Sequence, residues 1–278
     1  MRLAIVDNKR SAPSPGHTGS CPACNSPMIA KCGDQRIHHW AHRGERVCDH
    51  WWETETEWHR AWKLNFPEEW QEVILRDDRT GEKHIADVQT AQGLTIELQH
   101  SHLRPEERAA RENFYGGMVW VVDGLRLRRD LSRFKQGAAG LRPLAANRVY
   151  VHQFPDELFP SNWRMRKAPV FFDFGSGSPA DPLATVERSL WCLLPQRSRS
   201  YGVVVRFSRQ EFILAAREDS ELLLGQPVLM EVDQRLAVEQ RRRAAEGLEL
   251  AAVRKLELAA LLKRARRPKP YGRRWRRR

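Results

Sequence analysis

The chain has 278 residues, of which 41% are hydrophobic, so it is long enough for one large or two ordinary domains with a buried core. No apolar run approaches the roughly 20 residues that span a bilayer, and the N-terminal apolar stretch is too short for a signal peptide, so we expect a cytoplasmic protein without a membrane partner. The net charge of +12 is concentrated at one end: the last sixteen residues hold ten Lys and Arg and no acid, which leaves +2 for the rest.

Residues 1–50 are rich in cysteine and histidine. The segment "CPACNSPMIAKCGDQRIHHWAH" holds a Cys-x2-Cys pair, then fourteen residues, then a His-x2-His pair. These separations suit a tetrahedral structural zinc ion, Zn2+. The predicted ligands are Cys21, Cys24, His39 and His42. Cys32 and Cys48 are spare thiols that could replace a histidine, and the alternative is a loop of free thiols packed by tryptophans.

Residues 51–66 have helical spacing, because Trp58, Trp62 and Phe66 recur every four residues on one face. Pro67 then stops or kinks this helix. A strand is expected near 71–76, followed by a turn at "RDDRTGEK".

Two apolar runs, "HIADVQT" and "LTIELQ", follow as strands joined by a turn at 91–93. Successive side chains on a strand point to opposite faces of the sheet. The side chain of Asp87 therefore points away from those of its apolar neighbours, and Glu97 lies on the polar face of the second strand. If the strands are neighbours, both carboxylates can reach one side of the sheet. A carboxylate pair away from water is costly unless a cation lies between them, and Mg2+ or Mn2+ suits such oxygens. The alternative is a solvent-facing strand surface.

Pro105 opens a helix, "PEERAARENFY", and "MVWVVDG" after it suits a buried strand. The order of helix, three strands, helix and strand predicts an α/β fold with a sheet flanked by helices. Residues 131–232 are expected to form a mixed α/β extension of unknown role, with strands at "APVFFDFG", "SLWCLLP" and "YGVVVRFS" and a loop at "GSGSPADP".

The C-terminal part is predicted to be a long helix over 233–266, with Gly247 as a weak point, and a disordered basic tail over 267–278. Such a tail binds phosphate backbones by counterion release, and interleaved aromatic rings can stack on bases. The tail residues expected to contact nucleic acid are Arg273, Arg274, Trp275 and Arg276. The alternative is a tail that only aids solubility.

The runs "ETEWHRAWK", "HIADV", "IELQHS", "RENFY" and "MVWVV", in this order, resemble the CoiA-like competence protein family. The resemblance covers roughly residues 20–125. It implies a restriction-endonuclease-like core of the PD-(D/E)XK type over 51–130, preceded by a zinc-ribbon-like element over 1–50. It also implies that Asp87 and Glu97 hold the metal and that Gln99 fills the third active-site position. Many nucleases of this fold carry lysine there, and Lys63 could substitute for it.

The family's Glu-Ser-x-x-His element matches Glu55, Thr56 and His59, with threonine in place of serine. Whether Glu55 or Glu57 is the acid that faces the site is left open by the sequence. Arg111 and Tyr115 match the family's arginine and tyrosine on the second helix, where support of the site or a DNA contact is expected.

The resulting hypothesis is a metal-dependent DNA nuclease, or a protein that processes branched DNA, in competence, recombination or repair. Its expected partners are single-stranded or branched DNA and proteins of recombination or competence. The alternative is a non-catalytic nucleic-acid-binding adaptor that uses the zinc element and the basic tail. A protein that binds RNA is a weaker possibility, because no RNA-recognition signature is present.

Overall fold

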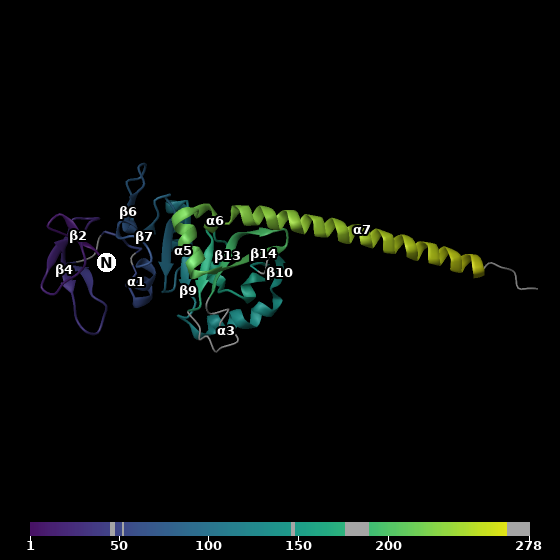
Figure 1. Cartoon of the computed structure of the whole chain (residues 1–278), viewed down its shortest axis with the longest axis horizontal. Coiled ribbons are helices and arrows are strands. Elements are labelled where there is room, and N and C mark those ends of the chain that lie inside the picture. The colour runs from purple at the N-terminus through teal and green to yellow at the C-terminus, as the bar shows by residue number, and fades with distance from the viewer. Residues whose placement is uncertain (45–47, 52, 146–147, 176–188, 266–278) are drawn as a thin grey trace, which may run out of the picture. The chain divides into compact units, whose positions relative to one another are not determined.

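The structure is a computed structural model that describes residues 1–44, 48–51, 53–145, 148–175 and 189–265. The chain divides into two compact units, Met1–Val232 and Asp233–Arg278. The first unit contains two separate β-sheets with helices, so the protein belongs to the mixed α/β class (Figure 1).

The N-terminal sheet is antiparallel, with the order β2-β1-β3-β4-β5. Its small core is formed around Trp40 and Met28, both fully buried, with Cys21 packed against them. Its strands are β1 (Ala4–Val6), β2 (Lys9–Ser11), β3 (Thr18–Ser20), β4 (Pro27–Lys31) and β5 (His39–His42).

The second sheet has nine strands in the order β10-β11-β14-β13-β12-β9-β8-β7-β6. The half of this sheet that comes first in the chain consists of β6 (Gln71–Arg76), β7 (Lys83–Gln89), β8 (Thr95–Gln99) and β9 (Met118–Asp123). The second half is β10 (Arg142–Ala145), β11 (Val149–His152), β12 (Val170–Asp173), β13 (Ser189–Ser198) and β14 (Tyr201–Ser208). The strands expected between residues 71 and 123 and the three expected after residue 167 are therefore present.

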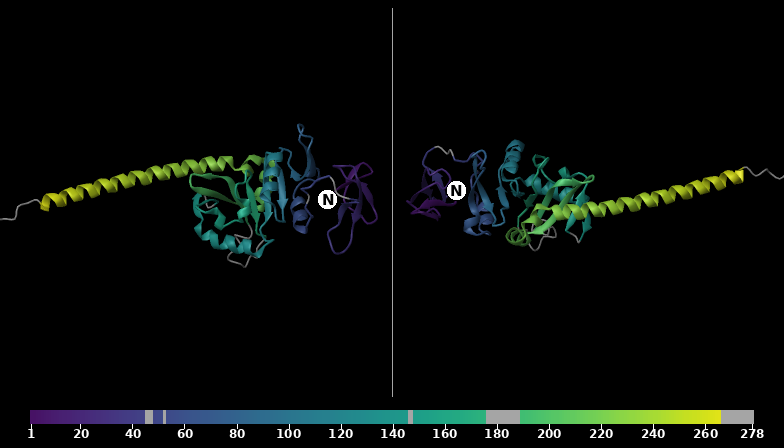
Figure 2. Two further views of the ribbon diagram at one scale, coloured as in Figure 1. Left: turned by 180° about the vertical axis from the view of Figure 1, so that it is seen from behind. Right: turned by 90° about the horizontal axis from the view of Figure 1, so that it is seen from above.

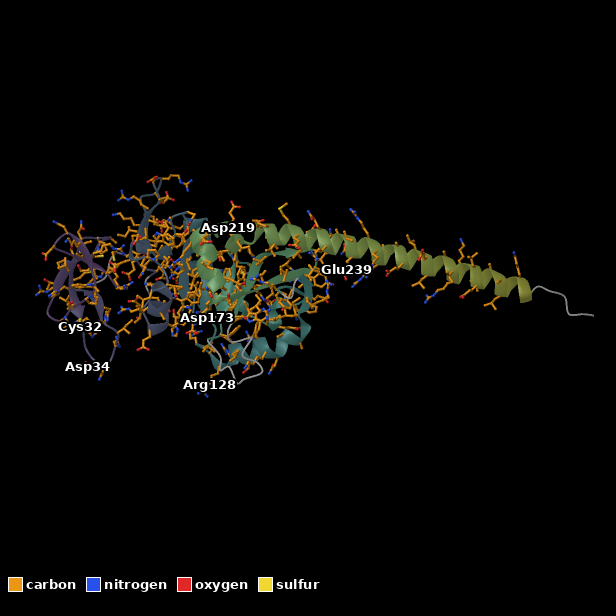
Figure 3. All side chains as sticks on the ribbon, in the orientation of Figure 1. Cys32, Asp34, Arg128, Asp173, Asp219 and Glu239 are labelled. Atoms are coloured by element: carbon orange, nitrogen blue, oxygen red, sulfur yellow. The ribbon has the colours of Figure 1, made fainter. Side chains whose placement is uncertain are left out.

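Helix α1 (Glu57–Lys63) is shorter than the predicted helix over 51–66. It begins where Thr56 caps it: the Thr56 hydroxyl accepts from the His59 backbone N–H, and the His59 ring accepts from the Thr56 backbone N–H. The indole N–H groups of Trp58 and Trp62 both donate to Asp173 Oδ2, at 3.1 and 2.9 Å. Asp173 lies among packed side chains, so two indoles bonded to one buried carboxylate fix α1 against β12 (Figure 3).

The three strands β6, β7 and β8 are antiparallel neighbours. The turn between β7 and β8 needs Gly93, whose φ of 83° is in the left-handed region. Strand β9 pairs in parallel with β8, and this parallel arrangement requires the crossover helix α2 (Pro105–Tyr115), which begins at the predicted proline. The short helix η1 (Glu68–Trp70) precedes β6.

Residues 131–232 extend the same sheet. Strand β12 pairs in parallel with β9 and antiparallel with β13, and β14 and β11 follow. Aromatic residues fill the core here, with Trp120, Phe134, Phe172 and Trp191 in one cluster. The sequence pattern did not locate the individual helices of this part. They are α3 (Arg128–Gly137), η2 (Ala138–Gly140), η3 (Pro155–Glu157), η4 (Ser161–Trp163), α5 (Arg209–Glu218) and α6 (Ser220–Leu224). Most of the expected loop "GSGSPADP" lies outside the described residues.

Helix α7 (Gln226–Ala265) begins before the predicted start at residue 233 and continues through Gly247 without interruption (Figure 2). Its residues from Asp233 onward form the described part of the second unit. The predicted basic tail, with Arg273, Arg274, Trp275 and Arg276, lies outside the described residues.

Candidate active site

A cavity of about 60 Å³ lies where α1, α2 and the strands β6 to β8 meet. Two permanent cations, Lys63 and Arg111, line it together with His59 and Tyr115. The acidic residues that line it are Asp49, Glu53, Glu55, Glu72, Asp87 and Glu97. Acids therefore outnumber side-chain cations by six to two in this cavity.

Asp87 and Glu97 meet on one side of the sheet, as strand alternation predicts. Val88 pairs with Ile96 and Gln89 with Thr95, and this register places Glu97 opposite Asp87. The Asp87 backbone N–H donates to Glu97 Oε1 at 3.3 Å, and the Leu98 backbone N–H donates to Asp87 Oδ2 at 3.0 Å. Glu97 is only 3% exposed, which excludes the alternative of a solvent-facing surface for this residue.

Lys63, at the end of α1, is buried and joins the acids of three segments. Its Nζ lies 2.9 Å from Asp87 Oδ1, 3.3 Å from Glu72 Oε1 and 3.8 Å from Glu55 Oε1. Burial alone would lower the pKa of Lys63, but the three carboxylates raise it above its usual value. Lys63 is therefore a fixed positive charge at the centre of the site.

Arg111, on α2, supports Glu97 from the other side. Its Nη1 lies 3.0 Å from Glu97 Oε2, and its Nη2 donates to Glu107 and to the Trp51 carbonyl. Even with this partner, burial and then the charge of Asp87 raise the pKa of Glu97 to about 7. Arg111 therefore does not offset the burial of Glu97 and the neighbouring charge of Asp87.

The burial of Arg111 and Tyr115 corrects the expectation of a DNA contact. Arg111 is 5% exposed, and its Nη1 and Nη2 groups both donate to partners inside the protein, while Tyr115 faces the cavity and packs against the aromatic core. Burial raises the pKa of Tyr115, so its hydroxyl stays protonated. Of the two roles that the sequence left open, support of the site is the one that this geometry allows.

Glu55, not Glu57, is the acid that faces the cavity. Glu55 precedes the helix and is 5% exposed at its side chain, with Oε2 2.8 Å from Arg60 Nη2. Its Oε1 is buried and makes no hydrogen bond among the described residues. Glu57 is the exposed first residue of α1 and does not line the cavity.

His59 is buried and neutral. Its Nε2–H donates to the Leu98 carbonyl at 3.2 Å, because a carbonyl can only accept, and its Nδ1 then accepts at the α1 cap, 2.9 Å from the Thr56 hydroxyl. Burial lowers the pKa of His59. With both ring nitrogens engaged, His59 holds α1 against β8.

Gln99 is the last residue of β8, and its side chain is held by Glu53, a residue that the sequence analysis did not identify. Gln99 Nε2 donates to Glu53 Oε2 at 2.7 Å, and the Ser101 backbone N–H donates to Glu53 Oε1. Gln99 Oε1 is buried without a partner among the described residues. Burial, ahead of all other effects, raises the pKa of Glu53.

Glu72 was also missed. It lies opposite Asp87 in the β6–β7 register and has a φ of 49°, an unusual conformation for a residue with a side chain. Its carboxylate accepts from the backbone N–H groups of Arg2 at 2.7 Å and Leu3 at 3.0 Å. Burial would raise the pKa of Glu72, but Lys63, the N-terminal ammonium and these two N–H groups lower it to about 2. Its position inside the apolar run "QEVILR" is the same signal that identified Asp87.

A Cys3His group that could bind zinc is present in the N-terminal part. Its ligand atoms lie within 4.8 Å of one another and come from Cys21, Cys24, His42 and Cys48. Cys24 Sγ and Cys48 Sγ lie 3.4 and 3.5 Å from His42 Nε2. Burial and the nearby thiols raise the pKa of Cys48 to about 12, so this thiol is protonated until a cation replaces the proton.

His39 is not part of this group, which corrects the predicted ligand set. Both histidines lie on β5, three residues apart, and an odd separation on a strand directs side chains to opposite faces. The His39 ring instead bonds the Ile37 carbonyl at 2.9 Å. Cys48, one of the two spare thiols, takes its place, and Cys32 follows β4 outside the group.

A second cluster joins Asp49 and His50, the two residues after Cys48, to His84 of β7. Asp49 Oδ1 lies 3.0 Å from His84 Nδ1, and Asp49 Oδ2 accepts from the Ile85 backbone N–H at 2.8 Å. His84 Nε2 lies 2.8 Å from Glu82. Because Asp49 and His84 are already bonded to each other, and His50 packs against the His84 ring, the cluster fastens the segment after the Cys3His group to β7.

The fold and the two sites define a mixed α/β protein with an acidic cavity and an N-terminal Cys/His group that could bind a metal ion. Residues 16–50 match the family model described as Competence protein CoiA, N-terminal domain. The matched segment contains all four members of the Cys3His group. It confirms the similarity to the CoiA-like family and suggests a competence-related function. Comparison with curated proteins and comparison with solved structures each returned no match.

No helix in the described ranges is both long enough and apolar enough to cross a membrane.

Proposed function

We propose that the chain is a divalent-metal-dependent deoxyribonuclease that processes DNA in competence, recombination or repair. One observation carries the proposal: Asp87 and Glu97, from neighbouring strands, converge with Lys63 on a single buried cavity. The order of α1, three antiparallel strands, α2 and a parallel strand supports it, because a PD-(D/E)XK nuclease core has the same order.

The cavity suits a divalent cation on three grounds. Its acids outnumber its side-chain cations. Glu55 Oε1 and Gln99 Oε1 are buried oxygens that lack a hydrogen-bond donor among the described residues. Burial, and after it the charge of Asp87, raises the pKa of Glu97, and a bound cation would favour its ionised form. Carboxylate and amide oxygens are the ligands that Mg2+ and Mn2+ prefer.

Asp87 and Glu97 would hold the ion, and Glu55, which also lines the cavity, would supply a further oxygen. When bound, such an ion activates water and neutralises charge on a phosphate. Many nucleases of this fold carry a lysine at the position that Gln99 occupies here. Lys63, from α1, supplies a permanent ammonium group in its place and can donate to a phosphate oxygen. His59 and Arg111 keep the strands and Glu97 in place. Glu53 orients the Gln99 amide.

Cleavage of single-stranded, duplex and branched DNA with Mg2+ or Mn2+ tests the proposal. We expect Asp87→Asn and Glu97→Gln to retain DNA binding but to lose at least about 10³-fold in cleavage rate, since the ion contributes several kcal/mol. Glu55→Gln should also reduce the rate. Glu57→Gln is the matched control, because this carboxylate points away from the cavity, and it should cut at the wild-type rate.

Unchanged cleavage by Asp87→Asn would contradict the assignment of the site. A wild-type protein that binds DNA with a steep salt dependence but cuts none of the substrates would instead support the adaptor function.

A further inference from the structure

A second, basic cleft of about 240 Å³ lies at the carboxyl ends of β8 and β9. It lies between the segment that follows β8, the N-terminal part of α3 and the short helix η4. The residues that bear on its chemistry are His100, His102, Arg126, Arg129, Arg133 and Asn162.

The basic cleft adjoins the acidic cavity through a short stretch of chain. Glu53, which lines the cavity, accepts from the backbone N–H of Ser101, which lines the cleft. The rings of His59 and His100 have their centroids 6.0 Å apart across the same boundary. The cleft and the cavity are therefore neighbours, with the chain at Ser101 between them.

The cleft is positively charged because of one short segment. Residues 126–135 contain five Lys and Arg and a single acid, Asp130. The other acid of the cleft, Asp123, is held 2.8 Å from His100 Nδ1. Arg128, the first residue of α3, is also exposed and lies at the outer surface of the unit (Figure 3).

The arginines of the cleft differ from the structural arginines of this protein. Arg166 donates to the carbonyl oxygens of Trp163 and Leu194, and the buried Arg108 donates to that of Asn162. Arg126 and Arg133 form no ion pair within the described parts of the chain. The nearest carboxylate contact of Arg129 is long, with 4.0 Å between its Nε and Asp130 Oδ1. Among the described residues, the cleft thus presents guanidinium groups that no close ion pair holds, although all three attract Asp130.

We propose that the basic cleft binds the phosphodiester backbone of the DNA strand whose reacting phosphate lies at the acidic cavity. A guanidinium group can donate two parallel hydrogen bonds to the oxygens of one phosphate. Contacts to the phosphate backbone of DNA position a strand without reading its sequence. The proposal rests on the proposed nuclease function. It also provides the DNA contact that the buried Arg111 and Tyr115 do not.

The test compares the full-length triple variant Arg126→Gln, Arg129→Gln, Arg133→Gln with wild type. Binding of a fluorophore-labelled single-stranded DNA is measured by anisotropy at several salt concentrations in buffer without added Mg2+ or Mn2+ and without chelator, so that no cleavage occurs and bound zinc is retained. Loss of three phosphate contacts should weaken binding at least about tenfold at low salt. It should also make the plot of log affinity against log salt shallower by about 2. A second triple variant, Arg76→Gln, Arg79→Gln, Lys83→Gln, removes the same charge from the exposed β6–β7 turn and should bind as wild type does.

Equal affinity and slope for wild type and the cleft variant would overturn the proposal, as would an equal loss in the turn variant. A loss confined to RNA, with DNA binding intact, would also overturn it. If the triple variant does not fold by circular dichroism, Arg129→Gln alone serves, because this side chain is 75% exposed, and the slope should then fall by about 0.7. Because the assay contains no added divalent ion, failure of this proposal is distinct from failure of the nuclease, which appears as intact binding without cleavage.

Discussion

The acidic cavity and the Cys3His group both gather metal-ligating atoms, but they are held together in different ways. The cavity acids lie on adjacent strands of a nine-stranded sheet, and Lys63 and Arg111 already neutralise part of their charge. The Cys3His ligands lie at strand ends and connecting segments of a small sheet, and burial together with the neighbouring thiols raises the pKa of Cys48. We therefore expect the cavity to form without an ion and the Cys3His group to depend on one.

The largest expected effect is the loss of zinc from the Cys3His group. We expect about one zinc ion per chain, and Cys48→Ser should remove it and unfold the N-terminal sheet, since structural zinc contributes roughly 10–16 kcal/mol in zinc-finger peptides. Elemental analysis and chemical denaturation measure both effects. His42→Ala should behave in the same way.

Two matched variants control this prediction. Cys32→Ser and His39→Ala change the same residue types outside the group and should retain zinc. Loss of zinc in His39→Ala with retention in Cys48→Ser would restore the ligand set expected from the sequence.

A smaller effect is expected in the cavity, where the protein supplies its own cations. Lys63→Met leaves three carboxylates without their shared partner and should lower the free energy of unfolding by about 3–5 kcal/mol. Urea denaturation followed by circular dichroism measures it. Added Ca2+ or Mn2+ should stabilise this variant more than wild type, because a divalent ion can replace the missing charge.

Lys83→Met is the control for this change, since Lys83 is an exposed residue at the start of β7. A Lys63→Met variant as stable as Lys83→Met would show that the cavity acids do not need the ammonium group. The comparison between the two sites would then fail.

Local patterns were sufficient for the part of the sheet that carries the cavity. The strands β6 to β9 and helix α2 follow from apolar runs, a glycine turn and Pro105. Helix α1 was predicted too long, because regular tryptophan spacing continues past a start that the Thr56 cap determines. The pairing of β12 with β9 could not be predicted, since it joins residues about fifty positions apart through contacts that no local pattern contains.

The sites show the same division between local and distant information. Asp87 and Glu97 were found because an acid inside an apolar strand is anomalous, and Glu72 obeys the same rule. Strand parity within "HWAH" would have separated His39 from His42. Glu53 could not be found in this way, because its partners Gln99 and Ser101 are contacts across the fold.

The smallest predicted effect concerns pH and separates Glu72 from its acidic neighbours. Its pKa of about 2 in the folded protein lies below the ordinary 4.5, so its stabilising contribution is complete above pH 4.5 and disappears as the pH falls toward 2. This contribution is up to about 3 kcal/mol. Glu97 acts in the opposite direction, because its raised pKa makes ionisation between pH 4.5 and 7 unfavourable to the folded state.

The two effects overlap in wild type, so the difference between wild type and Glu72→Gln is the quantity to measure. We expect the variant to be less stable at pH 7 and the gap in urea midpoint to close between pH 4.5 and 2, because only wild type loses a carboxylate there. Glu69→Gln, at an exposed acid of η1, should show no such gap. A gap that stays constant down to pH 2 would mean that Glu72 acts through its shape and hydrogen bonds. Its charge would then not be the link between the N-terminal residues Arg2 and Leu3 and the cavity.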